Sequence, residues 1–284
     1  AELGVAEHIY RFHAALEVWE HPFWREWARD DLDEYCGFVR EETDLRLGIE
    51  ADYVPGREDR IANLLEQRDW DYVVGSVHFL RDRSLDTEDY SIWGSGESAE
   101  KVWRRYFETV AESALSGLYD IVAHPDLVKV WGEKAPKPDK DPRYFYEPAV
   151  EAFAEAGVAV ELSTAGLRKP VGELYPARPY LEMILDAGCP IALSSDAHVP
   201  DQLGFGYEQA LELLEELGVG ELYPARPYLE MILDAGCPIA LSSDAHVPDQ
   251  LGFRYEQALE LLEELGVGEL AVFERRTRRM EPIG

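Results

Sequence analysis

The sequence predicts an α/β fold in which parallel strands alternate with helices. Short apolar segments alternate with segments of helical periodicity along the chain, and several of the apolar segments end in histidine or carboxylate residues. A segment that carries one such strand and two helices also occurs twice in tandem. This alternation is typical of a parallel sheet with crossover helices, whose sites lie at the carboxyl ends of the strands. We expect one barrel-sized domain over residues 1–284.

Five strands are expected before the repeat. They cover residues 4–7, 45–49, 72–78, 120–126 and 158–163. The first runs directly into His8, and the second into Glu50. Each is short and apolar, as buried parallel strands are.

Helices are expected between these strands. They cover a stretch that ends near residue 42, then residues 58–67, 98–116 and 146–156. In the third, Val102, Tyr106, Val110 and Ala114 recur every four residues and form an apolar stripe. Gly157 stands just past the fourth, where a glycine commonly ends a helix.

The repeat comprises residues 171–218 and 219–266, 48 residues each, which differ only at Gly206 and Arg254. Each copy predicts a helix opened by Pro179 or Pro227, a strand ending in Asp-Ala-His, and a second helix. Ancient repeats diverge while they keep a pattern, so these copies indicate a recent duplication or a deliberate construction. The tail, residues 270–284, predicts a short strand and a solvated basic cluster.

The amino-acid composition limits the classes of molecule that this chain is expected to bind. Asp and Glu number 57 against 27 Lys and Arg, a net charge of -30, which disfavours nucleic acid and anionic membranes. An anionic substrate would need metal ions or local arginines. No apolar run approaches the roughly 20 residues of a membrane helix, and no signal peptide is visible. The number of cysteines is odd: Cys36, Cys189 and Cys237. This favours reduced thiols in a cytoplasmic protein over a disulfide framework.

Six imidazole and carboxylate groups stand at the expected strand ends. These residues are His8, Glu50, His78, His124, Asp196 and His198. A lone histidine at a strand end is usually structural, but six such groups on five strands indicate a site. Because cysteine is absent from the set, the ligands suit Zn, Mn or Fe, and bridging carboxylates suggest more than one ion. His13 and His21 are expected on the surface or on a pocket wall.

The motifs at these strand ends resemble those of a known family. The motifs are AEH at residues 6–8, GIEAD at 48–52, GSVH at 75–78, AHPD at 123–126, STAGLRKP at 163–170 and SDAH at 195–198. Together they resemble the histidinol-phosphate phosphatase branch of the polymerase-and-histidinol-phosphatase (PHP) family. The resemblance follows nearly the whole chain in order. It implies a distorted seven-stranded (βα) barrel that binds up to three metal ions and hydrolyses L-histidinol phosphate in histidine biosynthesis.

The resemblance also implies roles for particular residues. The six strand-end groups would be metal ligands, and Arg168 would hold the phosphate. Asp196 and Arg168 are the catalytic candidates. Tyr10, Arg11 and Lys169 are weaker candidates for the substrate pocket.

The sequence departs from the family pattern in two ways. Members of the family begin with a strand that ends in His-x-His, and that motif occurs nowhere here; the Asp-x-His strand, single in the family, occurs twice. Five strands before the repeat and two within it again make seven. We expect residues 239–246 to fill the place of the absent first strand, with Asp244 and His246 as metal ligands.

Three interpretations remain open. The first is a working phosphatase with two or three divalent ions and a small phosphoester substrate. The second is a folded but catalytically impaired barrel with an incomplete metal site. The third is a domain-swapped oligomer that exchanges the spare unit. A monomer and a homodimer are both compatible with the sequence.

Overall fold

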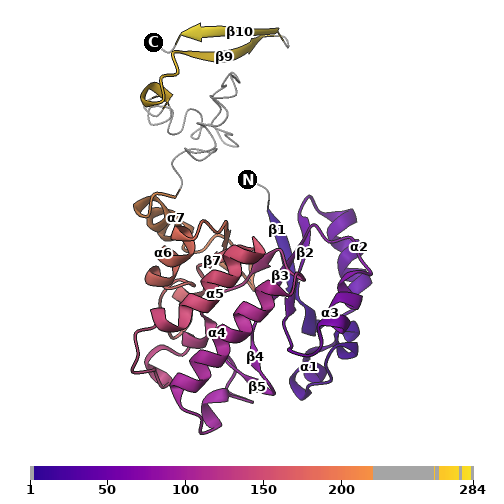
Figure 1. The fold of residues 1–284 in the computed structure, drawn as a ribbon. Helices are drawn as coiled ribbons and strands as arrows, with labels where there is room; N and C mark the ends of the chain where they lie inside the picture. The colour runs from indigo at the N-terminus through magenta and orange to yellow at the C-terminus, as the bar shows by residue number, and fades with distance from the viewer. Residues whose placement is uncertain (1–2, 220–258, 260–261, 275–276, 283–284) are drawn as a thin grey trace. The chain divides into compact units, whose positions relative to one another are not determined.

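The structure is a computed structural model that describes residues 3–219, 259, 262–274 and 277–282. The chain divides into two compact units, residues 1–210 and 211–284, each of which is described by itself (Figure 1). The second copy of the repeat lies almost wholly outside the described residues.

The first unit is built on a six-stranded parallel sheet in the order β1-β2-β3-β6-β7-β8. The strands are β1 (Gly4–His8), β2 (Arg46–Asp52), β3 (Tyr72–Ser76), β6 (Ile121–Val122), β7 (Ala159–Ser163) and β8 (Ile191–Ser194). The alternating pattern therefore predicted the fold class correctly. The seventh strand stays a prediction, because residues 239–246 lie outside the described part. So does the single domain over all 284 residues.

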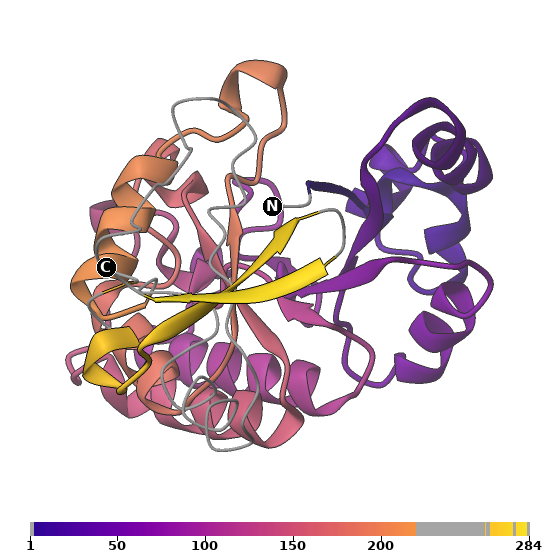
Figure 2. The ribbon, with the colours of Figure 1, turned by 90° about the horizontal axis from the view of Figure 1, so that it is seen from above.

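The sheet is curled, with helices on its outside. Seen from above, these helices follow one another around the sheet in chain order, from indigo through magenta to orange (Figure 2). They are α1 (Pro22–Trp27), α2 (Leu32–Glu42), α3 (Glu58–Leu65), α4 (Ala99–Leu115), α5 (Arg143–Ala156) and α6 (Arg178–Asp186). Strands β1 and β8 end the sheet among the described residues.

Short elements join these helices and strands. The 3-10 turns are η1 (Ile9–Arg11), η2 (His13–Glu17), η3 (Ile92–Gly94), η4 (Leu127–Lys129), η5 (Gly132–Lys134), η6 (Ala165–Arg168) and η7 (Pro200–Gln202). A small antiparallel pair, β4 (Phe79–Leu80) and β5 (Arg83–Ser84), follows β3.

Strand register brings the polar strand ends together. His8 is the partner of Glu50 across β1 and β2, and Asp52 is the partner of Ser76 across β2 and β3. Strand β2 runs three residues beyond its expected end, so that Glu50 and Asp52 lie within it and share a face. At the other end, the Tyr72 ring fills the space over Gly48, where a Cβ would lie only 2.4 Å from the ring.

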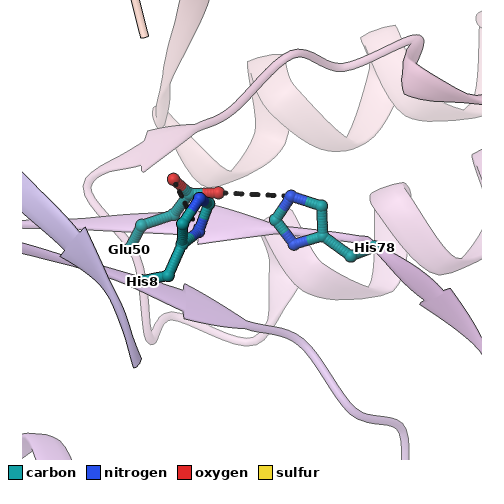
Figure 3. Close-up of side chains that lie close together, drawn as sticks. All are labelled: His8, Glu50 and His78. Atoms are coloured by element: carbon teal, nitrogen blue, oxygen red, sulfur yellow. Dashed lines mark ion pairs between the residues drawn. The ribbon is translucent and has the colours of Figure 1, made fainter. Parts of the chain in front are cut away.

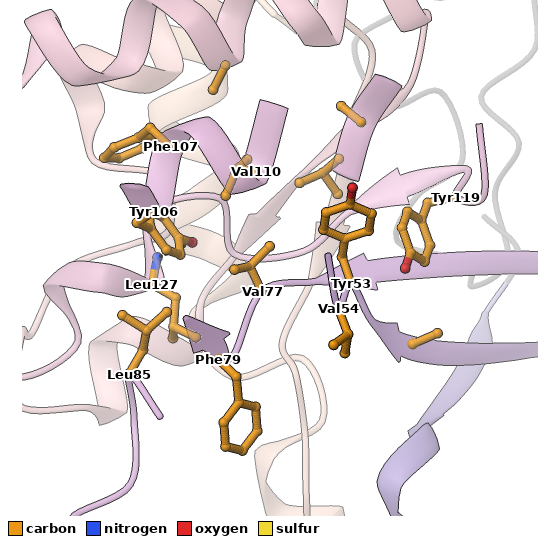
Figure 4. Packing of buried hydrophobic residues seen from close by; sticks show 14 of the residues in the cluster. Tyr53, Val54, Val77, Phe79, Leu85, Tyr106, Phe107, Val110, Tyr119 and Leu127 are labelled. Atoms are coloured by element: carbon orange, nitrogen blue, oxygen red, sulfur yellow. Dashed lines mark hydrogen bonds between the residues drawn. The ribbon is translucent and has the colours of Figure 1, made fainter. Parts of the chain in front are cut away.

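Helix α4 packs its predicted stripe into the core. Val102, Tyr106, Val110 and Ala114 are all buried, and α5 packs alongside α4 (Figure 1). Figure 4 shows Tyr106 and Val110 in the same buried cluster as Val77 and Leu127. Burying each large apolar side chain contributes about 1.5–3 kcal/mol, so this stripe fixes α4 against the sheet.

Helix ends follow the local sequence. The Asp31 carboxylate accepts hydrogen bonds from the backbone N–H groups of Asp33 and Glu34 and so caps α2. Gly157 ends α5 in the left-handed conformation, at φ +66°, as its position predicted.

Gly206, the one position at which the two copies of the repeat differ, lies in a tight contact. Its φ is +71°, and a Cβ there would lie 2.8 Å from Cδ1 of Leu167 and 3.3 Å from Cβ of Thr164. The hydroxyl of Thr164 donates a hydrogen bond to the carbonyl oxygen of Phe205 and holds the same loop. The loop between β8 and α7 (Tyr207–Glu216) thus packs directly on the segment after β7.

The second unit contains an antiparallel hairpin of β9 (Glu269–Glu274) and β10 (Thr277–Pro282). The tail was expected to hold one short strand and a solvated basic cluster; instead it forms two paired strands, and Arg278 and Arg279 lie in the second. Among the described residues Cys36 and Cys189 are free thiols. A search of the described residues found no helix with the length and apolar character needed to cross a bilayer.

Candidate metal centre

The carboxyl ends of the curled strands bring histidines and one glutamate together. His8 ends β1, Glu50 lies near the end of β2, and His78 follows β3 (Figure 3). Each of these three side chains offers a ligand atom, and the three atoms all lie within 4.8 Å of one another. Such a cluster is what several strands can build at a common rim.

Glu50 is the centre of the cluster. Its Oε2 lies 3.3 Å from Nδ1 of His8, and its Oε1 lies 3.5 Å from Nε2 of His78 and 3.4 Å from Nε2 of His124. Glu50, His78 and His124 are buried. One carboxylate thus faces three imidazoles from three other strand ends.

The donor set fits a divalent cation. Nδ1 of His124 is buried and has no hydrogen-bond partner within the described part of the chain. Nδ1 of His8 and Oε1 of Glu50 are buried too, and they meet their neighbours as ion pairs without hydrogen-bond geometry. Buried polar atoms without partners are costly, and metal coordination relieves that cost. Imidazole nitrogens and a carboxylate, without thiolate, are ligands for Zn, Mn or Fe.

The charges within the cluster are strongly coupled. Burial alone would raise the pKa of the Glu50 carboxyl, but the imidazoles of His8, His124 and His78 hold that pKa well below its usual range. Burial would likewise lower the pKa of His78, yet the Asp52 and Glu50 carboxylates raise it to about 10. Positive charge is therefore favoured at this point of the molecule, whether protons or a cation supply it.

Asp52 fixes the orientation of His78. Nδ1 of His78 lies 2.8 Å from Oδ1 of Asp52, which is buried, and a carboxylate there requires the proton on Nδ1. Nε2 is left to face Glu50. Histidines that bind metal ions usually donate their other ring N–H to a carboxylate or carbonyl oxygen in this way. Asp52 is part of the GIEAD motif, but no role was predicted for it from the sequence. Its place two residues after Glu50 on one strand could have identified it as a neighbour of the site.

The turn after β8 places Asp196 and His198 next to the cluster. Nε2 of His198 lies 3.2 Å from Nε2 of His8, so a side chain from the turn after β8 reaches the end of β1. Oδ1 of Asp196 lies 3.7 Å from Nδ1 of His198. The structure therefore brings His198 into contact with the cluster and Asp196 into the same turn.

The expected substrate residues lie in different surroundings. Tyr10 stacks on the His8 ring, with centroids 4.7 Å apart, and burial raises the pKa of its hydroxyl. Arg11 pairs with Asp30, its Nη2 2.8 Å from Oδ2. Arg168 donates from Nη2 to the carbonyl oxygens of Ser195 and Asp196, whereas Lys169 is exposed.

Glu161 is a buried carboxylate that was not singled out from the sequence. It lies in β7 and accepts a hydrogen bond from the backbone N–H of His124, and burial raises its pKa to about 7. A signal was available, because a glutamate within an otherwise apolar strand seldom lacks a partner.

Asp244 and His246, the remaining expected ligands, lie outside the described residues. His13 is exposed, as expected. His21, which was expected on the surface or a pocket wall, is buried among the Trp19, Phe79 and Tyr90 rings.

A curled parallel α/β sheet with a histidine and carboxylate cluster at its carboxyl rim defines a class of barrel-like metal-binding proteins. Within that class, the family model described as the PHP domain matches residues 3–165. The chain belongs to the PHP domain family.

Known proteins are similar to this chain in sequence and in fold. A Deinococcus radiodurans protein described as "Probable histidinol-phosphatase" is 33% identical over 224 residues, which cover 76% of this chain and 84% of that protein. The Bacillus subtilis histidinol-phosphatase is 29% identical, over 64% of this chain and 74% of that protein. The fold is similar to the histidinol phosphate phosphatase of Lactococcus lactis in complex with Zn, L-histidinol and phosphate, with a TM-score of 0.57 and 18% identity, covering 77% of this chain and 84% of that one.

Proposed function

We propose that this chain is a metal-dependent phosphatase that hydrolyses L-histidinol phosphate to L-histidinol and phosphate. The observation that carries the proposal is the Glu50 carboxylate, which faces the imidazoles of His8, His78 and His124 at the strand ends. The names of the similar proteins supply the substrate. These proteins are similar to this chain in sequence or in fold.

Divalent metal ions held by this cluster would polarise a phosphoester oxygen, lower the pKa of a water molecule and offset the charge that develops at phosphorus. Two or three ions of Zn, Mn or Fe are proposed. His8, Glu50, His78, His124, Asp196 and His198 would hold them. Because the chain has a net charge of -30, such cations would also offset its repulsion of a phosphate.

Arg168 is the proposed phosphate contact within the chain. Its Nη2 is occupied by two carbonyl oxygens, whereas its Nη1 is buried and has no hydrogen-bond partner among the described residues. A guanidinium group can serve both, because it carries five donors in one plane. Asp196 stays the second catalytic proposal beside Arg168, and Tyr10, Arg11 and Lys169 stay weaker proposals for contact with the substrate.

Phosphate release from L-histidinol phosphate, measured beside the metal content of the same sample, tests the proposal. We expect release in protein loaded with Zn or Mn, loss of release after chelation, and recovery when metal is returned. His124→Ala should lose both metal and activity. His13→Ala, which removes an exposed histidine, is the matched control.

Two outcomes would contradict the proposal. No metal binding in protein supplied with Zn or Mn would remove its basis. Metal binding without phosphate release would favour the second interpretation, a folded but catalytically impaired barrel.

We also propose that residues 239–246 supply the seventh strand, with Asp244 and His246 as further ligands. Support comes from sequence, because residues 239–246 repeat residues 191–198 without change. It also comes from the described sheet, which ends at β1 and β8 and so leaves two edges that a parallel strand could pair. Deletion of residues 219–266 should then lower metal content and solubility. A deletion variant with the metal content of the full chain would exclude this role, and a dimer of the full chain would favour the swapped arrangement.

A further inference from the structure

Two of the proposed ligand residues have an unfavourable backbone conformation. His124 has φ +23° and Asp196 has φ +45°, although neither is glycine. Such conformations are strained in residues other than glycine and persist only where surrounding contacts hold them. His124 follows β6 and Asp196 follows β8, and the strand between these two is β7.

Glu161 of strand β7 holds the turn that contains His124. The carboxylate is 7% exposed, and its Oε2 accepts a hydrogen bond of 2.6 Å from the backbone N–H of His124. This bond fixes the peptide that enters the strained residue. It therefore sets the direction in which the His124 ring leaves the backbone, toward Glu50.

Arg168, in the turn after β7, holds the turn that contains Asp196 and His198. Nη2 donates to the carbonyl oxygens of Ser195 at 2.8 Å and of Asp196 at 2.9 Å, the two carbonyls on either side of the strained Asp196 peptide. The same Asp196 oxygen accepts a hydrogen bond from Nδ1 of His198 at 3.1 Å. A carbonyl oxygen can only accept, so the proton lies on Nδ1 and Nε2 is left to face His8.

We propose that Glu161 and Arg168 are positioning residues of the metal centre, which hold the His124 turn and the Asp196–His198 turn from the strand between them. Each acts on the backbone of a turn that carries ligands and not on a ligand side chain. For Arg168 this role is additional to the phosphate contact proposed above. The inference rests on the proposed metal centre but not on the identity of the substrate.

Cobalt binding by the metal-free full chain tests the inference without any substrate. Co²⁺ gives visible absorption that reports the geometry of its ligands, and its titration gives an affinity. Glu161→Met and Arg168→Met keep side chains of similar length but remove the acceptor and the donors. We expect each to weaken cobalt binding about 10- to 100-fold, the usual cost of losing an outer partner of a ligand, and to alter the absorption spectrum.

Conservative variants separate positioning from direct ligation. Glu161→Gln keeps an oxygen that can accept from the His124 N–H, so cobalt affinity should return to within a few-fold of the wild-type value. Arg168→Lys keeps one nitrogen that can donate to both carbonyl oxygens, but on a shorter side chain, and should fall between wild type and Arg168→Met. Glu155→Met and Arg143→Met, at exposed positions of α5, are the matched controls. Should Glu161→Met fail to fold, Glu161→Asp shortens the acceptor by one carbon and should shift affinity in the same direction.

Several results would overturn the inference. Wild-type cobalt affinity and spectrum in folded Glu161→Met and Arg168→Met would do so. Equal losses in Glu161→Gln and Glu161→Met would make the Glu161 carboxylate a ligand in its own right. Absence of cobalt binding by the wild-type chain would leave no ligand to position. Absence of phosphate release from L-histidinol phosphate would overturn only the proposed function.

Discussion

His8 and Glu50 are partners in the register of two neighbouring parallel strands, and their side chains meet where the pairing ends, with Nδ1 3.3 Å from Oε2. The backbone pairing of β1 and β2 thus determines the distance between two proposed ligands. A slip of one residue would turn either side chain to the opposite face of the sheet.

Glu50→Gln should remove the charge on which the cluster depends. The three imidazoles would then face a neutral amide, so a divalent cation would lose its central anionic ligand. We expect metal affinity to fall by more than the roughly 10- to 100-fold cost of losing an outer partner. Metal analysis after dialysis and phosphate release measure the effect, and Glu66→Gln, at an exposed position, is the control. Unchanged metal content would contradict the central place of Glu50.

Asp52→Ala should weaken metal binding through His78. Without the carboxylate 2.8 Å from Nδ1, the ring loses both its fixed proton and its orientation. We expect affinity to fall about 10- to 100-fold in Asp52→Ala and less in Asp52→Asn, which keeps an acceptor. Titration of the metal-free protein measures this, with Asp59→Ala on the surface of α3 as the control. Equal affinities in wild type and Asp52→Ala would show that His78 is oriented by other contacts.

His21 should make stability fall as the pH falls. Burial lowers the pKa of this imidazole below its usual 6.5, so below pH 6.5 the unfolded chain binds a proton that the folded chain resists. Stability is therefore lost between pH 6.5 and the lower folded pKa. His21→Asn keeps an acceptor for the N–H of Phe23 but does not titrate. The stability of wild type relative to this variant, from urea unfolding, should decrease from pH 7.5 to pH 5.5; a constant difference would contradict the prediction.

Gly206→Ala should destabilise the first unit. The left-handed backbone alone costs an alanine about 1–2 kcal/mol, and the Cβ would lie 2.8 Å from Leu167. Gly188→Ala is a matched control, because Gly188 has φ +75° but open space around its Cβ. Urea unfolding should show a larger loss for Gly206→Ala. Equal losses in the two variants would mean that the loop moves to accept the methyl group.

The members of the histidine and carboxylate cluster could be predicted from sequence because each stands at a strand end. His8, Glu50, His78 and His124 follow apolar runs, and the carboxyl ends of parallel strands meet at one rim. The length of a strand was harder to predict from sequence. Strand β2 continues to Asp52 because its pairing with β3 extends that far. Such pairing depends on a segment that is distant in the sequence.

The supporting contacts could not be read from sequence. Arg168 binds backbone carbonyl oxygens, which every residue carries, so no pattern marks its partners. His21 is buried by the Trp19, Phe79 and Tyr90 rings, two of which are remote in sequence. The hairpin of β9 and β10 was missed because its second strand is rich in arginine, which resembles a solvated tail.

Gly206 also affects which of the two nearly identical segments of the chain pairs with β7. Either copy of the repeat could in principle run beside β7, and their strands and helices would have the same local energies. The competing threading would place Arg254 at the position of Gly206, where any Cβ meets Leu167 and Thr164 and where φ is +71°. A difference of about 2 kcal/mol would already bias the two threadings roughly 30-fold. We therefore expect this one difference in 48 positions to favour the first copy beside β7.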